Sequence, residues 1–433
     1  MKRILLPHQF YYPHMDSFKN RANKSLTESF FKSLDEESES NNAMIYVHIP
    51  FCDSKCAFCG FDKAYNLTKI QQYVSSIEKE IQFYSGKKYI KKLNITGVHI
   101  GGGTPTIIEP SLFGHLIDTI RKYFNLDDVM FNIEGSATTL KNDGILDVIQ
   151  EKKISRVSVG VQTFFPPLRN EYQTKATIEN VYETLDKLKK RDIVTYIDIM
   201  YGFPDFNIGK VKDIVLSDLK TANELDLDGI DFGQVYPFHN PLEKRITEEN
   251  LQFSTSDEVI DIIREATDFL ESNSYKQVTE YAFIKKGDII IEKSYFGSDE
   301  GIADCIAIGS GAFGYINGTK YRNSSYELYL SDALTGYSQI KQLTQPEKER
   351  TPIIGFPKVL SLNKKFINAS ELIQKEYTPK FNQLLKENLI EEKGDYFVLT
   401  REGKYFISNI YYFLLDDEER KKIDKQIKIL QLQ

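Results

Sequence analysis

The chain has 433 residues, of which 41% are hydrophobic and 27% are charged, a balance typical of a globular protein with two or three domains. Its 55 basic and 62 acidic side chains give a net charge of −7, and no long run of one sign occurs, which argues against a nucleic-acid-binding surface. No segment approaches the roughly 18 apolar residues of a membrane span, and the N-terminus lacks the apolar stretch of a secretory signal. We therefore predict a cytoplasmic protein that does not bind membranes.

The chain begins with a polar segment, residues 1–43, which ends in the acidic 35-DEESESNNA-43 and is predicted to be an N-terminal arm and linker. Short β-branched segments then alternate with amphipathic helical patterns. The predicted strands are 45–49, 96–100, 129–133, 155–161, 194–199 and 230–236, and the predicted helices between them are 67–84, 111–124, 143–152, 177–191 and 209–225. This alternation predicts an α/β fold with a parallel sheet, either open or curved into part of a barrel, over residues 44–245.

The pattern changes after residue 245. A helix is predicted over 256–273, and strand-like segments follow at 287–296 and 304–318, so residues 246–340 are predicted to extend the barrel and cover a substrate. Residues 341–433 are mostly helical, with a hairpin at 392-EKGDYFVLT-400, and predict a winged-helix-like domain. Acidic residues interleave with its basic ones, which disfavours a DNA-reading role.

Residue types that can do chemistry follow the predicted strands in succession. Parallel strands end at one rim, so these residues are expected to meet there, although each alone would more often be an ordinary loop residue. In chain order they are the cysteines at 52, 56 and 59, the 101-GGGTP-105 loop, Glu134, Gln162, Asp198, Gln234 and Tyr236.

The cysteines form a CxxxCxxC motif at Cys52, Cys56 and Cys59, while the fourth cysteine, Cys305, lies far away in sequence. A structural zinc site usually has four ligands, and no second cysteine pair exists. His48 is either a fourth zinc ligand or a packed imidazole. A cubane [4Fe-4S] cluster held by three cysteines leaves one iron open to a substrate, so three thiols are consistent with a catalytic site.

These motifs also carry a family resemblance. YVHIPFC, GGGTPT, 156-RVSVGVQTF-164, 197-IDIMYGFP-204 and 308-IGSGAFGYINGTKYRN-323 together resemble the radical S-adenosylmethionine superfamily, and within it the group named for oxygen-independent coproporphyrinogen III oxidase. The resemblance runs from about residue 45 to the C-terminus. It implies a partial (β/α)6 TIM-like barrel followed by a winged-helix-like helical domain.

The resemblance implies roles for individual residues. Cys52, Cys56 and Cys59 would bind a [4Fe-4S] cluster, whose open iron is chelated by S-adenosylmethionine and whose electron, supplied by a donor such as flavodoxin or ferredoxin, cleaves that molecule to a 5′-deoxyadenosyl radical. Tyr46 and His48 would lie beside the cluster and substrate as catalytic candidates. The residues expected to contact S-adenosylmethionine are Gly101, Gly102, Gly103, Thr104, Glu134, Gln162 and Asp198.

The sequence departs from the group's pattern at three places. Thr174, with Lys175 beside it, stands where the family has an arginine that binds the S-adenosylmethionine carboxylate, so Lys175 becomes a candidate for that contact. Gly60-Phe61 follows the third cysteine, where the oxidase has a fourth, which disfavours coproporphyrinogen oxidation. The chaperone motif HNxxYW has no counterpart at 291-IEKSYFGSDEG-301, which disfavours a haem chaperone.

The remaining branch of the family contains haem-opening anaerobilin synthases and class C radical methyltransferases, which use two S-adenosylmethionine molecules. The stretch 226–246 resembles the haem-opening subgroup. We therefore predict an enzyme that alkylates or methylates an sp2 carbon of a tetrapyrrole or other conjugated ring, with haem opening and iron release as one form of the reaction. The alternatives are a haem-binding delivery protein, a coproporphyrinogen III dehydrogenase and a zinc-stabilised barrel.

Two further sets of residues are candidates for binding a planar substrate. Aromatic residues of the arm would either cover it or pack the arm onto a domain. These are Phe10, Tyr11, Tyr12 and Phe18. Arg245, Lys320 and Arg322 are candidates for pairing with acidic substituents.

Overall fold

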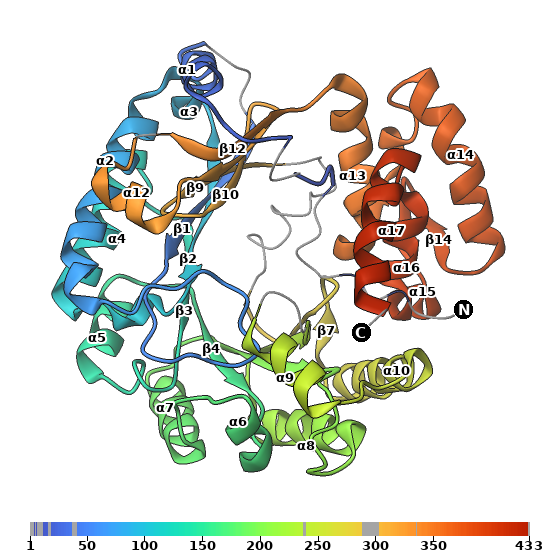
Figure 1. The fold of residues 1–433 in the computed structure, drawn as a ribbon, viewed down its shortest axis with the longest axis horizontal. Helices are drawn as coiled ribbons and strands as arrows, with labels where there is room; N and C mark the ends of the chain where they lie inside the picture. The colour runs from blue at the N-terminus through green and yellow to red at the C-terminus, as the bar shows by residue number, and fades with distance from the viewer. Residues whose placement is uncertain are drawn as a thin grey trace.

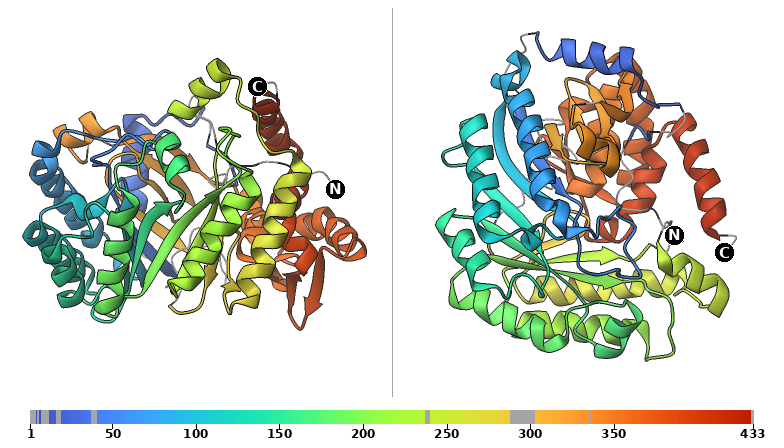
Figure 2. Two further views of the ribbon diagram at one scale, coloured as in Figure 1. Left: turned by 90° about the horizontal axis from the view of Figure 1, so that it is seen from below. Right: turned by 60° about the vertical axis from the view of Figure 1, so that its left-hand side comes forward.

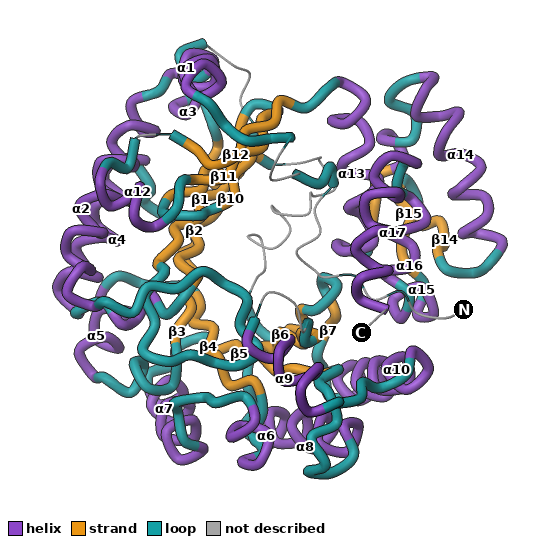
Figure 3. Tube along the Cα trace, in the orientation of Figure 1, coloured by secondary structure: helices purple, strands orange, loops and turns teal. Residues whose placement is uncertain are grey.

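One large curved sheet dominates the computed structural model, which describes residues 4, 6, 12–15, 19–36, 41–236, 240–287, 303–334 and 336–431, with side chains up to residue 424 (Figure 1). Within these ranges the sheet has twelve strands in the order β12-β11-β10-β9-β1-β2-β3-β4-β5-β6-β8-β7. The strands form an arc, with helices along its outer side (Figure 3).

Six parallel strands lie side by side in chain order, as predicted. They are largely buried, which fits a parallel sheet covered by helices. The strands are β1 (Asn42–Ile49), β2 (Asn94–Gly102), β3 (Met130–Gly135), β4 (Arg156–Gln162), β5 (Thr195–Tyr201) and β6 (Gly229–Gln234). The helices that connect them are α2 (Ile70–Gly86), α4 (Pro110–Phe124), α5 (Asp143–Glu151), α7 (Ile178–Lys190) and α8 (Val211–Glu224).

Local sequence signals define several of these helices. α7 begins with a capping box, in which Thr177 and Asn180 bond each other's backbone N–H groups, and Thr255 with Glu258 does the same for α10 (Ser256–Ser272). α4 starts with Pro110 in its first turn and ends at Asn125, which adopts a left-handed conformation. These signals help to explain why the predicted helix boundaries lie within about three residues of the observed ones.

The sheet extends beyond the six predicted strands. β9 (Asp304–Ile308) pairs in parallel with the free side of β1, followed by antiparallel β10 (Phe313–Ile316), β11 (Thr319–Asn323) and β12 (Tyr337–Gln342). The segment predicted as strand-like over 304–318 is therefore two strands joined by a turn. At the opposite edge lie β8 (Ala282–Ile284) and β7 (Lys276–Gln277). Apart from residue 287, the strand-like segment 287–296 lies outside the described residues.

The N-terminal arm contains a helix that the sequence analysis did not predict, α1 (Lys24–Ser33), capped by Asn23. Tyr12 is 3% exposed and donates a 2.7 Å hydrogen bond to the Asp416 carboxylate, while Lys320 donates to the carbonyl of Tyr12 at 2.6 Å. Tyr12 therefore packs the arm onto the rest of the molecule. Phe10, Tyr11 and Phe18 lie outside the described residues.

The C-terminal segment has the predicted order of helix, hairpin and helix, and it lies across the open side of the arc from α2 and α4 (Figures 1 and 2). Its elements are α13 (Gln345–Val359), β13 (Ser361–Asn363), α14 (Glu371–Lys386), β14 (Ile390–Lys393), β15 (Tyr396–Leu399), α15 (Arg401–Tyr405), α16 (Ile407–Leu414) and α17 (Asp417–Gln431). The three strands form a separate small sheet.

Shorter elements complete the fold, namely α3 (Lys88–Lys91), α6 (Pro166–Glu171), α9 (Pro241–Glu249), α12 (Tyr326–Ser331) and 3-10 turns at 67–69, 105–107 and 364–366. In the part of the chain that the structure describes, no helix is long and apolar enough to span a bilayer. The predicted domain boundaries at residues 43, 245 and 340 stay a prediction.

Candidate functional site

A hydrogen-bonded carboxylate, Glu134, lies at the end of β3. Its Oε1 is 2.8 Å from His99 Nε2, and its Oε2 accepts a 3.0 Å hydrogen bond from the backbone N–H of Gly102. Burial acts to raise the pKa of Glu134, but these hydrogen bonds and the nearby histidines outweigh it, so the pKa lies below its ordinary value. Glu134 is therefore held as an anion, and 39% of its side chain is exposed to accept a cationic partner.

Tyr46 and His48, the two catalytic candidates, lie on the same face of the sheet as Glu134. The strand register pairs Tyr46 with His99 and His48 with Gly101, and alternate residues of a strand share a face. The Tyr46 hydroxyl is 2.9 Å from His48 Nδ1, and the rings of Tyr46 and His99 stack with centroids 5.9 Å apart. Burial lowers the pKa of His48 to about 4, so its imidazole is neutral near pH 7.

The glycine loop after β2 approaches β1 and the cysteine segment closely. The Gly103 N–H donates to Ile49 O at 2.7 Å, and the Thr104 N–H donates to Phe51 O at 2.8 Å. A Cβ on Gly103 would lie 2.6 Å from Phe51 O, and one on Gly101 would lie 2.6 Å from Glu134 Oε1. Gly102 has φ of 111°, which side chains rarely adopt. The glycines are therefore sterically required.

The three clustered cysteines are all free thiols in one short segment after β1. Cys52 Sγ lies 3.4 Å from the Thr104 hydroxyl, and Cys56 Sγ lies 3.4 Å from the Ser54 hydroxyl. Burial raises the pKa of the Cys52 thiol, with a partial offset from the Thr104 hydrogen bond. The segment is fixed by backbone hydrogen bonds from Cys52 N to Ala64 O at 3.2 Å and from Cys59 N to Cys56 O at 3.2 Å.

A lysine that the sequence analysis did not identify, Lys63, lies among these thiols. Its ammonium group hydrogen-bonds Cys59 and interacts electrostatically with Cys52 and Cys56. Burial alone would lower the pKa of Lys63, but its electrostatic interactions with the three cysteines and its hydrogen bond to Cys59 raise it. The reverse also holds, because a fixed positive charge favours the thiolate form that metal binding needs.

Gln162 and Asp198 meet on β4 and β5. Gln162, which has φ of 71°, hydrogen-bonds the Asp198 carboxylate. Burial and the charge of Glu134 raise the pKa of Asp198, while Arg156 and the Gln162 hydrogen bond act against them. Asp198 lies beside Asp231 of β6 in the strand register, so this part of the sheet is polar.

Other residues predicted at the site form contacts with different parts of the chain or are buried. Lys175 Nζ forms a 2.8 Å ion pair with Asp53, the residue after Cys52, and Thr138 donates to the same carboxylate at 3.1 Å. The Tyr236 hydroxyl donates to Leu6 O, and Gln234 is buried at 8% exposure.

The motif segment 308–323 is held against β1 by a buried carboxylate. Glu80 of α2 accepts hydrogen bonds from the Gly309 N–H at 2.9 Å, the Tyr329 hydroxyl at 2.6 Å and Asn323 Nδ2 at 2.9 Å. Burial raises the pKa of Glu80 to about 7, with an offset from these hydrogen bonds. Tyr73 of the same helix donates to His48 O at 2.9 Å, so this segment is fixed beside the site.

Comparison with known proteins identifies this arrangement. Residues 46–217, which contain the cysteine segment, the glycine loop, Glu134, Gln162 and Asp198, match the family model of the radical SAM superfamily. These residues form a radical SAM domain. Enzymes of this family use a [4Fe-4S] cluster and S-adenosylmethionine.

Relatives within the superfamily cover most of the chain. It is 24% identical over 397 residues to anaerobilin synthase of Escherichia coli, covering 90% of this chain and 87% of that protein. It is 27% identical over 387 residues to Heme chaperone HemW of Lactococcus lactis, covering 86% of this chain and 97% of that protein. The chain is therefore similar to both proteins over most of its length.

The fold of the radical SAM enzyme matches that of coproporphyrinogen III oxidase from Escherichia coli with a TM-score of 0.74 at 20% identity, covering 94% of this chain and 96% of that one. This likeness confirms the predicted α/β fold, with its parallel sheet and helical C-terminal region.

Three cysteines of the radical SAM domain fit a [4Fe-4S] cluster. Among the described residues, no three His, Cys, Asp or Glu side chains are arranged around a single metal ion. In a cubane cluster each thiol binds a different iron, so the three sulfur atoms need not surround one metal ion. Cys52, Cys56 and Cys59 could therefore hold it, with Lys63 offsetting its negative charge. His48, once a candidate zinc ligand, is instead in contact with Tyr46.

Sequence reasoning missed His99 and Lys63. His99 lies two residues before Gly101 on β2, and alternate residues of a strand share a face. This spacing could have placed His99 on the same face of the sheet as the other site residues. Lys63 follows Cys59 by four residues, but only the turn of the chain between Cys59 and Ala64 brings its ammonium to the thiols.

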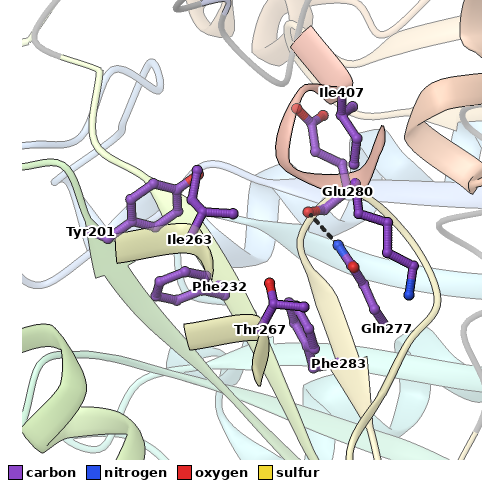
Figure 4. A pocket seen from close by; sticks show the side chains of 9 residues that line it. Tyr201, Phe232, Ile263, Thr267, Gln277, Glu280, Phe283 and Ile407 are labelled. Carbon is purple, nitrogen blue, oxygen red and sulfur yellow. Dashed lines mark hydrogen bonds between the residues drawn. The ribbon is translucent and has the colours of Figure 1, made fainter. Parts of the chain in front are cut away.

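A small pocket lies apart from this site, where the edge of the sheet meets α10 and the C-terminal segment (Figure 4). The rings of Tyr201 and Phe232 stack on one side with centroids 4.3 Å apart, and Gln277 donates to the Glu280 carbonyl at 3.4 Å. None of the predicted site residues lines it.

Proposed function

We propose that this radical SAM enzyme alkylates or methylates an sp2 carbon of a tetrapyrrole or other conjugated ring, with haem opening and iron release as the favoured form. The observation that carries the proposal is the three-thiol segment, which ends in Gly60-Phe61 rather than in a further cysteine. Its Cys52 contacts Thr104 of the glycine loop, whose Gly102 N–H donates to the anionic Glu134. Similarity to anaerobilin synthase over 90% of the chain supports the choice of a tetrapyrrole.

In this proposal the cysteine segment and the glycine loop bind the two cofactors. Cys52, Cys56 and Cys59 hold the [4Fe-4S] cluster, which supplies the electron for reductive cleavage of S-adenosylmethionine. The anionic Glu134 would accept hydrogen bonds from the methionine amino group of S-adenosylmethionine, and the open backbone at Gly101 to Gly103 would let that group approach.

Other residues position these groups. Asp198 and Gln162 accept and donate hydrogen bonds to ribose hydroxyls, and Lys175 anchors the cysteine segment through Asp53 rather than replacing the family arginine. Tyr46 and His48, which contact each other through the hydroxyl and Nδ1, orient the substrate. A second S-adenosylmethionine supplies the carbon unit, and a flavodoxin or ferredoxin supplies the electron.

The test is anaerobic reconstitution with iron and sulfide, followed by dithionite, S-adenosylmethionine and haem, with mass spectrometry of all products. We expect 5′-deoxyadenosine and an alkylated or linear tetrapyrrole. Cys56→Ala should abolish both, by more than about a hundredfold. Cys305→Ala is the matched control and should retain both, because Cys305 lies on β9, outside the cysteine segment.

Three results would contradict the proposal in different ways. Absence of S-adenosylmethionine cleavage despite an intact cluster would remove radical chemistry on this site. Stoichiometric haem uptake without turnover would favour a delivery protein, as in the HemW relatives. Oxidation of coproporphyrinogen III would favour the dehydrogenase alternative.

A further inference from the structure

Arg322 differs from the other two cations considered for pairing with acidic substituents. Arg245 is committed to Glu171 and Glu249 through 2.8 Å ion pairs with each. Lys320 donates to the backbone carbonyls of Tyr12 and Pro13. The Arg322 side chain, on β11, is 36% exposed, and its ion pair is a single 3.3 Å contact between Nη2 and Asp62 Oδ2.

Arg322 lies beside the site of the radical SAM enzyme. Its charge helps to lower the pKa of His48, so the guanidinium and the imidazole share one electrostatic environment. Its Nε donates to Gly311 O at 3.3 Å, in the motif segment that Glu80 fixes against β1. Its partner Asp62 lies three residues after Cys59. Arg322 thus bridges the motif segment and the end of the cysteine segment.

One half-exposed aromatic ring contacts this guanidinium, and a second precedes its ion-pair partner Asp62 in the chain. Phe313 of β10 is 50% exposed, and Arg322 Cζ lies 4.9 Å from the centroid of its ring. Phe61, immediately before Asp62, is also 50% exposed. Large apolar rings on a surface are stabilised when a flat apolar partner covers them. A guanidinium forms its strongest ion pairs with carboxylates. Together these groups fit a planar molecule with a carboxylate at its edge.

The present partner of Arg322 is weakly held. The Asp62 side chain is 91% exposed, and ion pairs this exposed contribute only about 0–1 kcal/mol. A carboxylate from a ligand that also covers Phe61 and Phe313 would replace Asp62, because the ligand brings apolar contact that Asp62 lacks.

We propose that Arg322, which contacts Phe313 and pairs with Asp62 next to Phe61, binds a carboxylate substituent of a flat conjugated substrate at the mouth of the site, displacing Asp62. This inference rests on the proposed function for the identity of the substrate. It adds the requirement that the substrate be an acid, recognised at a named residue.

The test compares haem with its dimethyl ester, which has the same ring but no free carboxylate, by absorbance titration of the reconstituted protein. We expect the wild-type protein to bind haem more tightly than the ester. Arg322→Gln should weaken haem binding by about tenfold to a hundredfold, the loss expected for a hydrogen bond to a charged group, while the affinity for the ester stays the same.

Three further variants sharpen the comparison. Asp62→Asn removes the competing carboxylate and should strengthen haem binding several-fold without changing ester binding. Phe313→Ala should weaken binding of both molecules. Lys69→Gln removes an exposed charge that hydrogen-bonds Gln72 and should change neither affinity. Cluster absorbance and the unfolding midpoint of each variant report whether it folds.

Equal losses for haem and ester in Arg322→Gln, or no loss for either, would overturn the inference. Its failure is distinguishable from failure of the proposed function. The comparison of haem with its ester measures binding affinity, and so reports whether the protein recognises the carboxylate. The proposed function is tested separately, by whether the wild-type protein forms 5′-deoxyadenosine and a tetrapyrrole product.

Discussion

The buried imidazole of His48 makes the free energy of unfolding depend on pH. Burial, the largest cause, lowers its pKa from 6.5 to about 4, with Glu134 acting in the opposite direction and Arg322 in the same one. A folded-state pKa below the unfolded value means that the stabilisation is present above pH 6.5 and is lost as the pH falls through 4. We expect the His48 contribution to the free energy of unfolding to fall by about 3 kcal/mol over this range.

The measurement is urea unfolding of the protein prepared without iron, between pH 7.5 and pH 4, in the wild type and His48→Asn. The variant should lack this part of the decline. His115→Asn, which changes a largely exposed histidine paired with Glu78, is the control and should retain it. Identical pH profiles for His48→Asn and the wild type would contradict the prediction.

The positions of the candidate site residues could be predicted where they depend on residues close together in the sequence. The three thiols and the glycines fall within single motifs, and Glu134 follows directly from its place at a strand end. Lys63 and His99 were missed, because their contacts join different turns or strands of the chain. The role of Lys175 toward S-adenosylmethionine stays a prediction, and its ion pair with Asp53 could not be read from the sequence, because the two residues lie far apart in the chain.

At the scale of elements, the close approach of the ends of β1 and β2 gives the second prediction. A Cβ on Gly103 would lie 2.6 Å from Phe51 O, and the backbone there cannot move without shifting the adjacent Cys52. We expect Gly103→Ala to lower the free energy of unfolding by about 1–3 kcal/mol, as overpacking does, and to reduce the iron bound after reconstitution.

Gly114→Ala on α4 is the matched control for this change. A Cβ there would find its nearest neighbour, Lys152 Cε, at 3.4 Å, and alanine suits a helix interior better than glycine by about 0.5–1 kcal/mol. It should leave iron content unchanged and stability equal or higher. Chemical unfolding and iron assays on both variants check this, and equal behaviour of the two would contradict the role of close packing at Gly103.

Elements with strong local periodicity were predicted, and those that depend on distant partners were not. The six parallel strands carry short segments of apolar, mostly β-branched or aromatic residues. In contrast, β11 and β12 contain mixed polar and aromatic residues, such as 319-TKYRN-323, and are strands because each pairs with a neighbour. α1 was missed because its sequence, KSLTESFFKS, is short and polar, and its single buried phenylalanine, Phe30, packs against Tyr321 of β11.

At the scale of the whole molecule, the N-terminal arm joins the large sheet to the C-terminal segment. Besides its bonds to Asp416 and Lys320, the arm donates from the His14 N–H to Glu419 at 2.8 Å. None of these contacts was predictable from the sequence, because they join residues about 300 to 400 positions apart. They make the arm a structural connection between segments at the two ends of the chain.

This connection gives the third prediction. Tyr12→Ala removes a ring that is 3% exposed and should lower the free energy of unfolding by about 3–5 kcal/mol, as other large-to-small changes do. Tyr12→Phe keeps the ring and loses the hydroxyl's hydrogen bonds to Asp416 and Arg350, so it should cost less, about 1.5–3 kcal/mol. Hydrogen exchange should show the Tyr12→Ala loss as faster exchange in α16 and at the start of α17, with β3 and β4 unchanged. Exchange that rises equally in all these elements would mean that the arm stabilises the sheet as a whole, and that its bonds to the C-terminal segment carry no separate stability.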